Sequence, residues 1–118
     1  MAELAKTPRP PYFAVIFTSI RPTPAELSRA PDDGYEATAN RMVELAQQQP
    51  GYLGLESSRG EDGLGTTVSY WRSLEDVARW KNVAEHLAAQ RMGREKWYRS
   101  YVLRVAKVED DWDFRRVD

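Results

Sequence analysis

The sequence predicts an α+β fold of the ferredoxin-like type, β-α-β-β-α-β, with a four-stranded antiparallel sheet and two helices on one face. One observation is that apolar, β-rich segments alternate with amphipathic segments of helical period. Another is the length of 118 residues, which suits one domain with its own core. We expect this domain over residues 12–109, after a flexible lead-in at 1–11 and before a charged tail at 110–118.

The first strand and the first helix occupy the N-terminal part of the predicted fold. The segment YFAVIFTSIR (12–21) has the β-branched and aromatic composition of a strand. The proline-rich stretch 22–33 predicts a loop in which Asp32 or Asp33 caps the following helix. The Pro-Gly pair at 50–51 ends that helix. Its apolar side chains recur at helical spacing: Tyr35, Ala39, Met42 and Ala46.

A β-hairpin is predicted in the middle of the chain. The segments YLGLESS (52–58) and TTVSYW (66–71) have the composition of strands. The glycine-rich segment RGEDGLG (59–65) between them is typical of a turn.

The second helix and the fourth strand complete the order of elements. Ser73 and Asp76 form a capping-box pattern at the start of a helix over 73–90. Gly93 marks the end of that helix or a break in it. The segment SYVLRVAKVE (100–109) predicts the last strand.

Both faces of the predicted sheet are apolar, although two helices cover only one of them. In the first strand, Phe13, Val15 and Phe17 alternate with the equally apolar Ala14 and Ile16. A monomer rarely exposes an apolar patch of that size. We therefore expect a homodimer in which two sheets pack face to face.

Composition excludes several classes of function. The 17 basic and 18 acidic residues give a net charge of −1, so we expect neither a nucleic-acid partner nor an anionic membrane partner. The chain has no cysteine and one histidine, which argues against thiol chemistry and against a transition-metal site. No segment approaches the ~20 apolar residues of a membrane helix. We expect a soluble, cytoplasmic protein.

Three segments carry a resemblance to a known family. PGYLGLESS (50–58) is similar to a helix-to-strand passage with a Pro-Gly turn, and VSYWRSLEDVARW (68–80) is similar to a strand-to-helix passage with two tryptophans. EHLAAQRMGREKWYRSYVLRVAKVE (85–109) is similar to a subgroup of bacterial proteins. Together with the order of elements, these segments resemble the antibiotic biosynthesis monooxygenases, a family of dimeric α+β barrels.

This resemblance implies a ligand cavity between the sheet and the helices of each protomer. It implies a monooxygenase without metal or cofactor, which oxidises a small aromatic or polycyclic compound after the compound has lost a proton. The alternative is a non-catalytic small-molecule-binding or stress-related protein on the same fold. Haem degradation ranks third, because the first strand has no asparagine and His86 follows Trp80 too closely to match the haem ligand of such enzymes.

The candidate substrate-binding residues are mostly aromatic: Trp80, Trp71, Tyr70, Trp97 and Arg104. On a helical wheel Trp80 lies on the apolar stripe, which predicts core packing, a cavity wall or both. Packing in the core or at the dimer interface is the alternative for the other aromatic side chains. Arg104 requires a partner in its apolar strand, either Glu56 in an ion pair or an anionic ligand.

His86 is the candidate catalytic residue, because a neutral imidazole is a general base near neutral pH. The wheel places it on the polar side of the helix, where a solvent-facing histidine is the alternative. A cavity-facing ring requires a kink near residues 81–83, and no proline or glycine occurs there.

Overall fold

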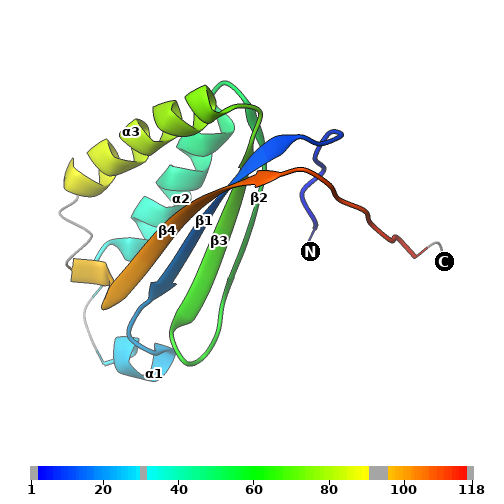
Figure 1. The fold of residues 1–118 in the computed structure, drawn as a ribbon. Coiled ribbons are helices and arrows are strands. Elements are labelled where there is room, and N and C mark those ends of the chain that lie inside the picture. Colours follow the sequence, from blue (N-terminus) through cyan, green and yellow to red (C-terminus); the bar gives the residue numbers. More distant parts are fainter. Residues whose placement is uncertain (1–2, 30–31, 91–95, 117–118) are drawn as a thin grey trace.

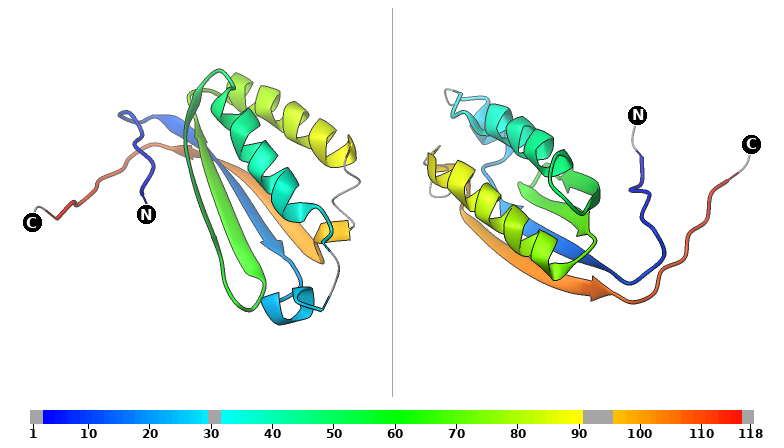
Figure 2. Two further views of the ribbon diagram at one scale, coloured as in Figure 1. Left: turned by 180° about the vertical axis from the view of Figure 1, so that it is seen from behind. Right: turned by 90° about the horizontal axis from the view of Figure 1, so that it is seen from above.

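The computed structural model describes residues 3–29, 32–90 and 96–116, and it confirms the ferredoxin-like α+β fold (Figure 1). Its sheet has the order β2-β3-β1-β4, and all neighbouring strands are antiparallel. Helices α2 and α3 lie over one face of the sheet, whereas both ends of the chain extend away from the helical layer (Figure 2). The elements are β1 Tyr12–Ile20, α1 Pro24–Leu27, α2 Tyr35–Gln47, β2 Tyr52–Arg59, β3 Leu64–Trp71, α3 Leu74–Gln90 and β4 Ser100–Val108.

The loop predicted after β1 contains a short helix, α1. Thr23 caps this helix and forms a reciprocal capping box with Glu26, while Pro24 occupies its first turn. These residues satisfy the free N–H groups of a helix start, so one helical turn forms where prolines alone indicate a loop.

The two longer helices start close to their predicted positions. At α3, the backbone N–H of Asp76 donates to Ser73 Oγ at 3.1 Å, which confirms the predicted cap. At α2, the capping position belongs to Gly34, with a φ of 80°. Asp33 Oδ1 accepts from the N–H of Tyr35, and Asp32 Oδ1 accepts from that of Gly34, so the two aspartates support the turn before the helix. Gly93, where a helix end was predicted, lies outside the described residues.

The hairpin strands are longer than predicted. Strand β2 continues through Arg59, and β3 begins at Leu64, because Asp62 and Gly63 make the turn tighter than the glycine count suggests. The extension matters for the site, since it turns Arg59 from a loop residue into a strand residue paired with Gly65.

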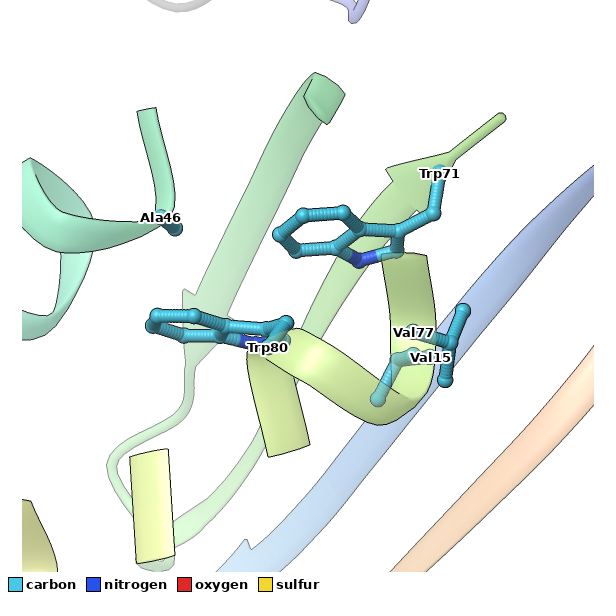
Figure 3. Close-up of a cluster of buried hydrophobic side chains, with 5 residues drawn as sticks. All are labelled: Val15, Ala46, Trp71, Val77 and Trp80. Atoms are coloured by element: carbon cyan, nitrogen blue, oxygen red, sulfur yellow. The ribbon is translucent and has the colours of Figure 1, made fainter. Parts of the chain in front are cut away.

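Two stacked indoles form the centre of the core (Figure 3). Trp71 of β3 is completely buried and Trp80 of α3 is 8% exposed, and their ring centroids are 5.7 Å apart at an interplanar angle of 20°. Val15, Ala46 and Val77 pack around them from the sheet and from both helices. The pair therefore connects β3 to α3 at the end of the sheet where α3 begins.

The helix-free face of the sheet is covered in part by the chain's own N-terminal segment. The N–H of Ala5 donates to Glu56 on β2 at 3.0 Å, and Thr7 Oγ donates to the hydroxyl of Tyr12 at 3.1 Å. Tyr12 and Ala14 on this face are buried, although their side chains point away from the helices. The flexibility of the lead-in remains a prediction, but residues 3–11 have a defined path across the sheet.

The rest of that face stays open. Ile20, Leu64 and Val102 are 39%, 49% and 47% exposed there. The tail beyond β4 leaves Trp112 and Phe114 almost fully exposed, at 89% and 84%. None of the described helices is long and apolar enough to cross a membrane.

Candidate functional site

A cavity of about 500 Å³ lies between the sheet and the two long helices. Its volume is in the range of pockets that hold small organic molecules. Its lining combines aromatic, aliphatic and a few polar side chains, among them Phe17, Tyr35, Met42, Leu55, Arg59, Trp80, Lys81, Glu85, Trp97, Tyr98, Tyr101 and Leu103.

The sheet forms the floor of this cavity as three rows, each with one residue from every strand in the order β2, β3, β1, β4. The first row is Leu55, Ser69, Val15 and Val105; the middle row is Ser57, Thr67, Phe17 and Leu103; the third row is Arg59, Gly65, Ser19 and Tyr101. Since side chains on one face of a strand recur every second residue, the first and third rows are about 13 Å apart.

The first row borders the apolar end of the cavity. Val15 belongs to the same core cluster as Trp80 and Val77, and all three line the cavity. Trp80 is therefore both a core residue and a cavity wall, as the helical wheel allowed. This end offers apolar contacts and the face of an indole.

The third row forms the polar end. Arg59 Nη2 donates to Ser19 Oγ at 2.7 Å, and its Nη1 donates to the carbonyl oxygens of Gly63 at 2.6 Å and Ser19 at 3.3 Å. A Cβ on Gly65 would lie 2.5 Å from Arg59 Cζ and 2.8 Å from Nε and Nη2. The guanidinium thus lies face-on over Gly65, and the missing side chain makes room for it.

A second arginine and two phenols adjoin this end. The guanidinium carbon of Arg21 lies 3.4 Å from the ring centroid of Tyr35, and the side chain is buried. Its Nη1 donates to the carbonyl of Trp97, and its Nη2 is 3.7 Å from the carboxylate of Asp33. Arg21 therefore has an acidic partner and an aromatic partner within the fold.

Tyr98 lies among these groups and lines the cavity. Burial, followed by the neighbouring phenol of Tyr35, raises the pKa of Tyr98 above its usual value, and the charges of Arg59 and Arg21 offset part of the rise. Tyr98 consequently stays protonated near neutral pH and presents a hydroxyl group rather than a phenolate.

Two of the five candidate substrate-binding residues line the cavity, Trp80 and Trp97. Trp97 is 5% exposed, and its indole N–H donates to the carbonyl of Asp33 at 2.9 Å. Trp71 lies behind Trp80 in the core. Tyr70 faces the opposite side of the sheet, where its hydroxyl donates to Glu56 at 2.7 Å. Strand alternation separates Tyr70 from the cavity.

Arg104 lies outside the cavity lining. It is paired with Ile16 in the sheet register, so its side chain belongs to the helix-free face. The alternative ion pair with Glu56 does not form either, because β4 and β2 are opposite edges of the sheet. Glu56 instead accepts hydrogen bonds from Tyr70 and from the N–H of Ala5.

His86 is exposed on α3 and is not among the described lining residues. The helix runs without interruption from Leu74 to Gln90, so the helical wheel applies along its whole length. Glu85, the preceding residue, does line the cavity, together with Lys81 one turn earlier. No group of three or more His, Asp or Glu side chains within the described ranges is arranged to hold a metal ion.

The sequence-based selection missed Phe17, Tyr35, Arg59 and Tyr98. Phe17 could have been found because it lies two residues after Val15 in the same strand, so that both side chains face the helices. Arg59 was hidden by the strand boundary, which was placed one residue too early. Tyr98 carried no local signal, since its position depends on the chain path after α3.

The fold and the cavity define a small α+β protein with a chamber between its sheet and its two long helices. The family model for antibiotic biosynthesis monooxygenases matches residues 25–92, more than half of the chain. The chain belongs to this family.

Two relatives are similar to the chain in sequence. The chain is 52% identical over 109 residues to "Uncharacterized protein YqjZ" of Bacillus subtilis, covering 92% of this chain and 90% of that protein. It is 31% identical over 98 residues to "Jasmonate monooxygenase ABM" of Pyricularia oryzae, covering 81% of this chain but only 43% of that protein.

Among solved structures, SnoaB, a cofactor-independent oxygenase from Streptomyces nogalater, is similar with a TM-score of 0.60 and 13% identity, covering 86% of this chain and 95% of that one. A protein from Mycobacterium tuberculosis is similar with a TM-score of 0.65 and 15% identity, covering 86% and 99%. At these identities, the two structures support the fold alone.

Proposed function

We propose that this protein is a cofactor-independent monooxygenase that acts on a small aromatic or polycyclic compound. The observation that carries the proposal is the cavity of about 500 Å³, with Trp80 at one end and aromatic side chains such as Phe17 and Tyr98 toward the other. Membership of the monooxygenase family supports the reaction class. The name of one relative, a jasmonate monooxygenase, supports a small organic substrate.

The proposed reaction needs a deprotonated, electron-rich substrate and O₂. The substrate loses a proton, its anion transfers an electron to O₂, and the two radicals combine at carbon to give a hydroperoxide. Loss of water leaves one oxygen atom on the substrate as a carbonyl, and the other leaves in the water. The protein holds the substrate against a largely apolar wall and orients it.

Glu85 is the residue that we assign to accept the substrate proton. It is the carboxylate among the described residues that line the cavity, and it lies on α3 at the position before His86. A carboxylate is a competent general base when it is held within hydrogen-bond reach of an acidic substrate proton. His86 is not the assigned base, because it is not among the described residues that line the cavity.

The test is oxygen consumption by the purified protein with a panel of hydroxylated anthrones and naphthols, in the presence of a metal chelator and without added cofactor. We expect uptake of one O₂ per product and incorporation of one ¹⁸O atom from ¹⁸O₂. Glu85→Gln should lower the rate by about 10²-fold or more, the usual scale of general-base catalysis. His86→Gln, the matched control on the same helix, should retain the rate.

Ligand binding without oxygen consumption by any compound would contradict the monooxygenase proposal. It would favour the second function, a non-catalytic small-molecule-binding protein, for which the largely apolar wall around Trp80 is sufficient. A rate lost in His86→Gln and retained in Glu85→Gln would overturn the assignment of the base.

We also infer that the protein acts as a homodimer with the helix-free faces of two sheets in contact. The exposed side chains of Ile20, Leu64 and Val102 on that face support this arrangement. Light scattering at micromolar concentration should give twice the chain mass of 13.6 kDa. Val102→Asp should abolish the dimer, whereas Leu74→Asp, at an even more exposed site on α3, should preserve it. A wild-type monomer would refute the inference.

A further inference from the structure

The cavity is chemically asymmetric along its length. Its first-row end is closed by Trp80, Val77 and Val15, which offer no charge. About two rows away, Arg59 brings a positive charge onto the floor. A ligand that fills both ends therefore meets an apolar wall at one end and a cation at the other.

Arg59 has no acidic partner in the described part of the chain. Its hydrogen bonds within the described ranges go to neutral oxygens of Ser19 and Gly63, and the ion pairs of those ranges do not include it. Arg21 differs, because Asp33 lies 3.7 Å from its guanidinium. The charge of Arg59 is therefore available to an anion that enters the cavity.

The contacts of Arg59 also fix the orientation of its guanidinium. Three of the five N–H groups of an arginine donate to protein oxygens here, two from Nη1 and one from Nη2. The two that remain belong to Nε and Nη2. This pair forms the edge of a guanidinium that donates two parallel hydrogen bonds to a carboxylate.

The absence of a side chain at Gly65 lets the Arg59 guanidinium lie against the sheet. A side chain at this position would collide with Cζ, Nε and Nη2 of Arg59, whereas glycine lets the planar group lie against the strand. Tyr98 borders the same end of the cavity and brings no charge there, because its phenol stays protonated. Donors that are oriented before the ligand arrives bind an anion without the cost of ordering them.

We propose that this end of the cavity is a carboxylate-binding site, and that the natural ligand is an amphipathic organic acid whose apolar body lies against Trp80 while its carboxylate pairs with Arg59. In this proposal Arg59, and not Arg104 as the sequence suggested, binds the anionic group of the ligand. The inference rests on the proposed use of the cavity as the ligand site, but it concerns binding and does not require turnover.

The probes for the test are 2-naphthylacetic acid and its neutral amide, 2-naphthylacetamide, which have almost the same shape. Isothermal titration calorimetry with the full chain at neutral pH should show the acid binding about tenfold or more tightly than the amide, as expected for a charge-assisted bidentate pair. Raising the salt concentration should weaken binding of the acid and leave the affinity of the amide unchanged.

Variants of single cations show which charge causes the preference for the acid over the amide. Arg59→Gln should remove the preference for the acid without changing the affinity of the amide. Arg104→Gln is the control on the opposite face of the sheet, and Lys81→Gln removes the other described cation of the lining. Both should keep the preference. Arg59→Lys keeps the charge but loses the parallel pair, so it should retain part of the preference.

Thermal melts accompany each variant, because Arg59 also bonds to the β1 end and to the hairpin turn. If Arg59→Gln does not fold, Arg59→Lys and the salt dependence of the wild type decide the question. Equal affinities of acid and amide in the wild type, no binding of the acid at millimolar concentration, or an acid preference lost in Lys81→Gln would overturn the proposal. Because no step consumes oxygen, a missing acid preference and a missing oxygenase activity are separate results.

Discussion

Replacing Trp80 tests whether the stacked indoles hold the core together. Trp80 is 8% exposed and stacks on Trp71, so nearly the whole side chain is removed from water. Burial of roughly 200 Å² of indole surface at 25 cal/mol per Å² is worth about 5 kcal/mol, of which alanine keeps a small part. Loss of the aromatic pair adds about 0.5–1.5 kcal/mol to the cost.

One feature of the structure lowers this cost. Trp80 borders the cavity, so part of the space vacated by the indole joins a volume that already exists. We expect Trp80→Ala to lower the free energy of unfolding by about 3–5 kcal/mol, which corresponds to roughly 12–20 °C in melting temperature for a chain of this size. Trp80→Phe retains a ring and should cost about half as much.

The assay is thermal and urea unfolding followed by circular dichroism, at one fixed protein concentration because association contributes to stability in a dimer. His86→Ala is the matched control, since it changes an exposed residue of the same helix. It should change the unfolding free energy by less than about 1 kcal/mol. A loss below about 1 kcal/mol in Trp80→Ala, or an equal loss in His86→Ala, would refute the account of the core.

Three further predictions follow from local geometry. Gly51 and Gly34 share a φ of 80°, but their surroundings differ. A Cβ at Gly51 would collide with the carboxylate of Asp76 on α3, whereas a Cβ at Gly34 would meet open space. Gly51→Ala should therefore melt several degrees below Gly34→Ala, and equal melting temperatures would contradict the steric argument. The backbone and side chain of Thr23 lower the pKa of Glu26, so its stabilising contribution is present above its ordinary pKa of 4.5 and is lost as the pH falls through the lowered value. Carboxyl titration by NMR should show this shift, and Glu26→Gln should flatten the acid limb of the stability profile. Burial raises the pKa of Tyr98, so its phenol should ionise later than an ordinary tyrosine in an ultraviolet pH titration. Tyr98→Phe should reduce the late component by one phenol without removing it, because burial also raises the pKa of Tyr70.

The fold was predictable because the relevant signals are local. Strand composition, the stripe from Tyr35 to Ala46 and the cap at Ser73 each depend on neighbours in the sequence, and together they determine the order of elements. The helical wheel also placed Trp80 inward and His86 outward, as the structure has them. Helix α1 was missed because its prolines were given more weight than the capping box of Thr23.

The site was predictable only in part, because it depends on which strands become neighbours. Arg104 and Glu56 look like partners when only their strands are known, yet the sheet order puts them at opposite edges. The position of Arg59 depends on one residue of strand length and on the glycine across from it. The contact of Ala5 with Glu56 on the helix-free face involves residues far from a helix or strand signal.

The three-row floor limits how ligand size can change during evolution or design. Strand side chains reach the same face only at every second position, so the usable length of the chamber changes in increments of about 7 Å rather than continuously. Enlarging the middle-row side chains, such as Ser57 or Thr67, would divide the chamber and separate the indole from the arginine. Shrinking Phe17 or Leu103 would instead widen the chamber at constant length. Width and length are thus set by different strand positions, and a library confined to the middle row would vary selectivity while both ends stay intact.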